Sequence, residues 1–75
     1  MTFELWDRSS GNRIGEFSEA DQAYELVAEI LEDEGVASAS ALMLMVEDDE
    51  GHSSRVADGP RLIGLVRGGA TVATA

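Results

Sequence analysis

Cysteine and lysine are absent from this chain, and histidine, tryptophan, tyrosine and proline occur once each. Without cysteine there is neither a disulfide framework nor a thiolate zinc site. The single histidine also argues against a zinc site built from imidazoles. A chain of 75 residues has room for one small domain. Such a domain buries only about 60% of its extended surface, so we expect marginal stability.

Long apolar segments are missing as well. The longest one, residues 41–46, is far shorter than the roughly 20 residues that a membrane-spanning helix requires. The first residues, "MTFELWDR", lack the basic and apolar regions of a secretion signal. We therefore expect a soluble, cytoplasmic protein.

Positive charge is scarce. Fifteen acidic residues face five arginines, which gives a formal net charge of −10. Nucleic acids and anionic membranes are bound through cationic side chains, so neither is an expected partner. Three explanations of the acidity stay open: solubility combined with a codon bias toward arginine, life in high salt, and a basic partner, including mimicry of DNA.

The first half of the chain predicts a hairpin followed by a helix. Residues 3–7 and 12–17 are rich in aromatic and branched side chains, as strands are. Gly11 suits the left-handed position of the turn between them, and Gly15 suits a bulge or a close approach. Residues 19–34 carry an apolar stripe at helical spacing, with Ser18 and Asp21 as an expected capping box and Gly35 as the expected end. The stripe consists of Ala23, Leu26, Val27, Ile30 and Leu31.

The second half repeats this layout. Residues 36–41 form a small-residue connection, residues 42–47 predict a central strand, and residues 53–57 its partner. Residues 61–66 fit a short helix, with Asp58 as cap and Pro60 in its first turn, or a strand. A shift of forty residues superimposes Gly11 on Gly51, and Phe3 and Leu5 on Met43 and Met45.

These elements predict one α+β domain over residues 1–67, followed by a flexible tail at residues 68–75. The expected fold is a four-stranded antiparallel sheet in the order ββαββ along the chain. One long amphipathic helix covers one face, with or without a short additional C-terminal helix.

The segment "VEDDEGHSSRVADG" has the composition of a metal or catalytic site, but its spacing favours a turn. The acids are consecutive, whereas calcium loops place their ligands at alternating positions. "DDEG" suits a turn with Gly51 in the left-handed conformation. No nucleophile elbow or phosphate-binding loop accompanies the histidine and serines. We predict no catalytic, cofactor or metal site. The residues weighed for such a site are Glu47, Asp48, Asp49, Glu50, His52, Ser53 and Ser54.

Trp6 is the residue with the clearest functional implication. If Phe3 and Leu5 face the helix, strand alternation places Trp6 on the opposite face of the sheet. A four-residue loop pairs Trp6 with Arg13, a cation–π geometry, and Leu5 with Ile14, whereas a three-residue loop pairs Trp6 with Ile14. One helix cannot cover both faces, so we predict that the uncovered face, or an edge of the sheet, serves self-association or binding of another protein. The contact residues are Trp6, Ile14, Met43 and Met45. The alternative is that residues 61–66 fold over them.

A second hypothesis concerns the polar side of the helix, where four acids lack a basic partner in the segment. They are Glu25, Glu29, Glu32 and Asp33. This side could bind a basic protein, as in an antitoxin-like or DNA-mimicking regulator. An enzyme is the third and weakest hypothesis, because the polar constellation that catalysis requires is missing.

The segments "LWDRSSGNRIGEFSEADQAYELV" and "LMLMVEDDEGHSSRVADG" together resemble short uncharacterised bacterial proteins of unknown function. Their pattern is a strand, SGN-x-x-G-x-F, a capped helix, a strand, a D-x-x-G turn and a strand. The resemblance covers residues 3–59. It implies a compact α+β fold and contributes no catalytic residue.

Overall fold

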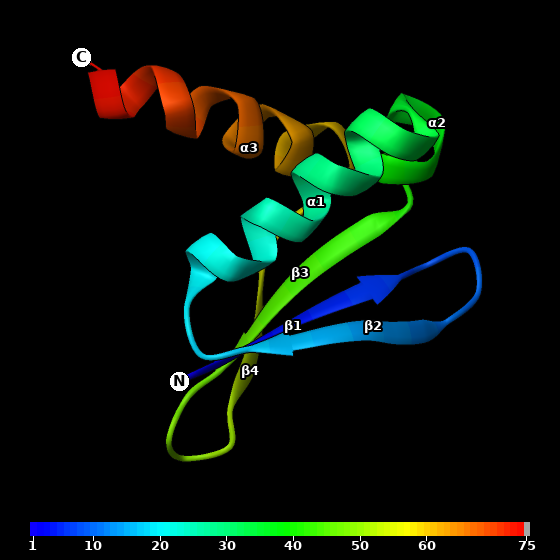
Figure 1. The fold of residues 1–75 in the computed structure, drawn as a ribbon. Coiled ribbons are helices and arrows are strands. Elements are labelled where there is room, and N and C mark those ends of the chain that lie inside the picture. The colour runs from blue at the N-terminus through cyan, green and yellow to red at the C-terminus, as the bar shows by residue number, and fades with distance from the viewer. Residues whose placement is uncertain (75) are drawn as a thin grey trace.

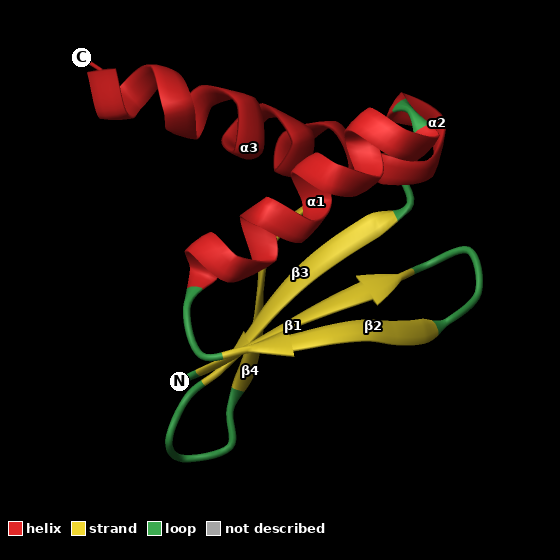
Figure 2. Cartoon of the chain, viewed as in Figure 1, coloured by secondary structure: helices red, strands yellow, loops and turns green. Residues whose placement is uncertain are grey.

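The chain folds into a four-stranded antiparallel sheet with helices on one side (Figures 1 and 2). The computed structural model describes residues 1–74. Along the chain the elements are β1 (Thr2–Asp7), β2 (Asn12–Phe17), α1 (Ala20–Glu34), α2 (Val36–Ala39), β3 (Leu42–Glu47), β4 (Ser53–Asp58) and α3 (Gly59–Thr74). The predicted α+β class and the four-stranded antiparallel sheet are confirmed.

Two hairpins make up the sheet, and along the chain a helix follows each hairpin. The strand order is β2-β1-β3-β4, so the hairpins meet along the antiparallel pair β1–β3. The pairing of each hairpin slips by one residue, between Leu5 and Trp6 in the first and between Leu44 and Met45 in the second. Leu5 itself pairs with Leu44. Gly11 and Gly51, which the predicted shift of forty residues superimposes, both have positive φ in the turns of their hairpins.

The first hairpin closes as its sequence predicts. Gly11 has a φ of 74°, and its amide donates to the Asp7 carbonyl over 2.8 Å. Gly15 follows the point where the register slips. A Cβ atom at Gly15 would lie 2.6 Å from Cζ of Phe17, so the ring of Phe17 occupies the space above this glycine. Gly15 thus permits both the bulge and the close approach expected of it.

Helix α1 begins one residue later than predicted. Glu19, not Ser18, is the N-cap residue. The side-chain oxygen of Gln22 accepts hydrogen bonds from the backbone amides of Ser18 and Glu19, each over 3.2 Å, so Gln22 takes the part that was expected of Asp21. The helix ends at Gly35, as predicted.

The core lies between the helices and one face of the sheet. Leu5 and Leu44 from the central strands, Val27 from α1 and Leu62 from α3 are completely buried. The predicted stripe of α1 is confirmed, because Ala23 and Val27 are buried and Leu26, Ile30 and Leu31 pack against the core. The connection predicted for residues 36–41 contains the short helix α2, whose Ala39 is buried.

The C-terminal segment is a helix, and it is longer than expected. Helix α3 spans Gly59–Thr74, and so includes most of the residues assigned to a tail. Asp58 was expected to cap this helix, but its carboxylate instead accepts hydrogen bonds from Arg8 and Arg55. Residue 75 lies outside the described residues.

Candidate interaction surface

The strands present two different faces. Leu5 and Leu44 point toward the helices, and alternation therefore turns Trp6 and Met43 to the other side. Helices α1 and α3 contact each other, and both lie on the side of the buried leucines (Figure 2). We call the opposite side the outer face. The expected alternative, in which residues 61–66 cover this face, is wrong, because Leu62 and Ile63 belong to the core on the helix side.

Three of the four predicted contact residues meet at the middle of the outer face. Trp6 is paired with Met43, and Met45 is two residues further along β3, opposite Glu4. All three side chains are partly exposed, and none belongs to the hydrophobic core. We call Trp6, Met43 and Met45 the apolar centre.

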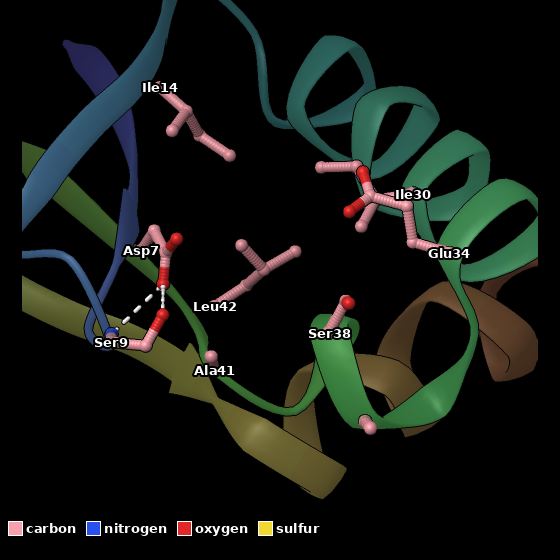
Figure 3. A pocket seen from close by; sticks show the side chains of 9 residues that line it. Asp7, Ser9, Ile14, Ile30, Glu34, Ser38, Ala41 and Leu42 are labelled. Atoms are coloured by element: carbon pink, nitrogen blue, oxygen red, sulfur yellow. Dashed lines mark hydrogen bonds between the residues drawn. The ribbon is translucent and has the colours of Figure 1, made fainter.

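The fourth predicted contact residue, Ile14, lies elsewhere. The slip in the β1–β2 register leaves Ile14 unpaired, because Leu5 pairs with Gly15 and Trp6 with Arg13. The four-residue loop and the Trp6–Arg13 pair, which belong to one of the two predicted registers, are confirmed. The Leu5–Ile14 pair of that same register is wrong. The side chain of Ile14 is 40% exposed and faces a pocket near Ile30 on the helix side (Figure 3).

An ion-pair cluster borders the apolar centre on the side of β2. Arg13 Nη1 donates to Glu4 Oε2 over 2.9 Å and to Glu16 Oε2 over 3.1 Å. Glu4 is the most shielded of the three, with 19% of its side chain exposed. We call Glu4, Arg13 and Glu16 the β2-side cluster, which carries one excess negative charge.

A second cluster borders the apolar centre on the side of β4. Asp58 Oδ2 accepts from Arg8 Nη1 over 2.8 Å and from Arg55 Nη1 over 3.2 Å. Arg8 Nη2 also lies 3.4 Å from the carbonyl of Ser40. We call Arg8, Arg55 and Asp58 the β4-side cluster, which carries one excess positive charge. Neither cluster was predicted: the β2-side cluster depends on the exact register of β1 with β2, and the Arg8–Asp58 contact depends on the two hairpins lying side by side.

The outer face is therefore nearly neutral in a strongly acidic chain. It holds three of the five arginines, and the two clusters balance each other, so that Glu47, on the same face by alternation with Met45, leaves it with about one negative charge. The helix side is different. The four acids predicted as a partner face, Glu25, Glu29, Glu32 and Asp33, are all exposed on α1. Among the residues that the structure describes, no ion pair includes them.

The acidic segment between β3 and β4 is a turn. Asp48 organises it, since its Oδ1 accepts hydrogen bonds from the amides of Glu50 and His52, each over 2.9 Å. Gly51 has a φ of 85°, as the turn prediction requires. The imidazole of His52 is exposed and lies 3.6 Å from the Asp48 carboxylate. These contacts account for Asp48 and Gly51 by the local structure of the turn.

A pocket of about 420 Å³ opens between the end of the first hairpin and the ends of α1 and α2 (Figure 3). Ile14, Ile30 and Leu42 supply its apolar wall. The Asp7 carboxylate on its rim is turned to Ser9, whose Oγ and backbone amide donate over 2.6 and 2.9 Å. These bonds stabilise the ionised form and lower the pKa of Asp7 below its ordinary value. The rim carboxylate thus already has its partners within the loop.

Comparisons with known proteins add no function. The sequence matches no protein-family model, and neither a curated protein nor a solved structure is found to be similar. Within residues 1–74, no helix has both the length and the apolar character needed to cross a membrane.

Proposed function

We propose that this chain is a non-enzymatic protein-interaction module that binds through the outer face of its sheet. The observation that supports this proposal is the apolar centre on a face that neither α1 nor α3 covers. Tryptophan, methionine and arginine are the side chains that interfaces favour, with apolar residues in the middle and charged residues at the rim. The outer face has this arrangement.

A face fits this function better than an edge of the sheet. Strand edges recruit other strands through unpaired backbone groups, and bulges disrupt that pairing. The register slip in each hairpin falls in an edge strand, at Ile14 in β2 and at Val56 in β4. Both edges are thereby poorer templates for another strand than a regular edge is.

The substitution Trp6→Glu tests the proposal. It places a carboxylate in the apolar centre, opposite Arg13, where an ion pair can preserve the fold. The matched control is Leu65→Glu, since Leu65 is 42% exposed on α3, on the other side of the molecule. We expect self-association, measured by light scattering after size exclusion, to be lost in W6E and kept in L65E.

Salt is the second variable of this experiment. Raising it from about 0.1 M to about 1 M shortens the screening length from about 10 Å to about 3 Å, and association through apolar contacts should survive. Circular dichroism controls for folding. A W6E variant that associates like the parent contradicts the proposal, whereas a parent chain that is monomeric at both salts restricts it to a partner other than a second copy.

The acidic side of α1 supports a second candidate, a regulator that binds a basic protein. Its basis is the set of four exposed carboxylates that form no ion pair with any described residue. Binding of an arginine-rich peptide should then weaken steeply with salt. It should also fall when the four acids are changed to their amides and stay unchanged in W6E. A peptide affinity that the four amides leave intact excludes this candidate.

A further inference from the structure

The charges of the outer face form a pattern across the sheet. The strand registers define two neighbouring rows of side chains, running from β2 to β4. The first row is Arg13, Trp6, Met43 and Asp58. The second row is Glu16, Glu4, Met45 and Arg55. The first row thus begins with a positive charge and ends with a negative one, and the second row has the opposite order.

This pattern is complementary to itself. Consider a two-fold axis that runs parallel to the strands, between β1 and β3. Rotation about this axis places the β4 side of a second copy over the β2 side of the first, and each row over the same row. Arg13 then faces Asp58 of a second copy, and Glu16 faces Arg55 of that copy. Trp6 faces Met43 of the second copy, a contact between sulfur and aromatic ring that is favourable in itself.

We propose that the occupant of the outer face is a second copy of this chain, stacked face to face about this two-fold axis. The inference rests on the proposed function and deepens it, because it names the partner and the geometry. Stacked sheets lie about 10 Å apart with strands crossing at about 30°. Trp6 and Met43 flank the axis and stay in contact under that rotation, whereas the charged ends of the rows adjust through long side chains.

The net charge of the chain supports this face over the others. Two copies with a formal charge of −10 each repel one another. On the outer face, the β2-side cluster has one excess negative charge and the β4-side cluster one excess positive charge, and the half-turn brings each onto the other. Contact through the exposed side of α1 would oppose unpaired acids instead.

A two-fold axis perpendicular to the strands gives a poorer arrangement. It also pairs opposite charges, with Arg13 against Glu16 of the second copy. However, it sets Trp6 against Glu4 of the second copy, so that the largest apolar side chain is buried on a carboxylate. The axis parallel to the strands sets Trp6 against Met43 of the second copy and Glu4 against Met45, so the carboxylate opposes the smaller apolar side chain.

The dimer should be weak. Four strands about 4.8 Å apart, with a rise of about 3.4 Å per residue, give a face roughly 20 Å on each side. Its footprint of about 400 Å² is half the roughly 800 Å² that each partner buries in a standard interface. Self-association is therefore to be followed over a wide range of chain concentration by sedimentation velocity.

Charge exchange between two variants tests the arrangement. Arg13→Glu opposes Asp58 of the second copy with a like charge, and Asp58→Arg opposes Arg13 in the same way. Each variant alone should self-associate roughly tenfold or more weakly than the parent, because two attractive contacts become repulsive in each dimer. An equimolar mixture should recover association near the parental level, since both contacts are then attractive. Each variant is checked for its fold by circular dichroism.

The outcomes separate this inference from the proposed function. If W6E abolishes parental association but the mixture stays monomeric, the outer face binds and the proposed axis is wrong. A mixture of Arg13→Glu with Glu16→Arg serves as the control, because only the perpendicular axis predicts recovery there, and recovery overturns the proposal. A parent chain that stays monomeric at every concentration overturns the face-to-face dimer alone, and a W6E variant that associates overturns both.

Discussion

The two faces of this sheet come from the same strands, yet the described chain covers only one of them. In β3, Leu42 and Leu44 are buried under helices, while Met43 and Met45, between and beside them, are partly exposed. The covered face is purely apolar at its centre, and the outer face is an apolar centre between two ion-pair clusters. The difference shows that the core is built on one face of the sheet only, and that the other face carries ion-pair networks with none of the described helices over it.

The largest expected difference between the faces lies in their contribution to stability. Leu44→Ala leaves a cavity in the core and should lower the free energy of unfolding by about 2–5 kcal/mol. Met43→Ala, one residue away, should lower it by about 1 kcal/mol or less. Urea denaturation of dilute, monomeric protein measures both. Equal losses would mean that the faces contribute equally to the fold.

Two glycine substitutions compare a glycine that lies against a core side chain with a glycine that has free space around it. Gly15→Ala brings a methyl group against the ring of Phe17 and should destabilise the fold by about 1–3 kcal/mol. Gly64→Ala meets nothing within 4 Å in α3 and should stabilise it by up to about 1 kcal/mol. Thermal unfolding of the two variants should shift in opposite directions. A loss in both would show that α3 does not tolerate alanine at this position.

The smallest expected effect concerns charge. Glu29 lies four residues from both Glu25 and Asp33 on α1, and like charges at this spacing repel. Glu29→Lys turns both contacts into attractions and should stabilise the chain by about 0.5–1 kcal/mol at low salt, with a smaller gain at about 1 M salt. Glu29→Gln, which removes the repulsion only, should gain less. A gain that does not depend on salt would point to helix propensity as its cause.

Local patterns predicted the elements well. Alternation in β1 identified the side of Trp6, and three- and four-residue spacing identified the buried stripe of α1. Turn glycines at Gly11 and Gly51 were also recognised, because their conformation depends on neighbours in sequence.

Features that depend on distant contacts were not predicted. The bulge that removes Ile14 from the outer face depends on the pairing of two strands. The β4-side cluster requires β1 to lie beside β3, since Arg8 reaches an aspartate fifty residues away, and the β2-side cluster requires the slipped register of the first hairpin. Which face of the sheet stays open is decided by the length of α3 and by its position beside α1. The amphipathic pattern of a helix does not predict on which face it packs.

The pairing of Leu5 with Leu44 has one more consequence. Two hairpin–helix units meet there as two separate molecules would, with β1 against β3 and α1 against α3. The connection through α2 makes their encounter intramolecular and raises the effective concentration of each unit toward the other into the millimolar range. A contact too weak to hold two free units together can thereby stay formed within one chain.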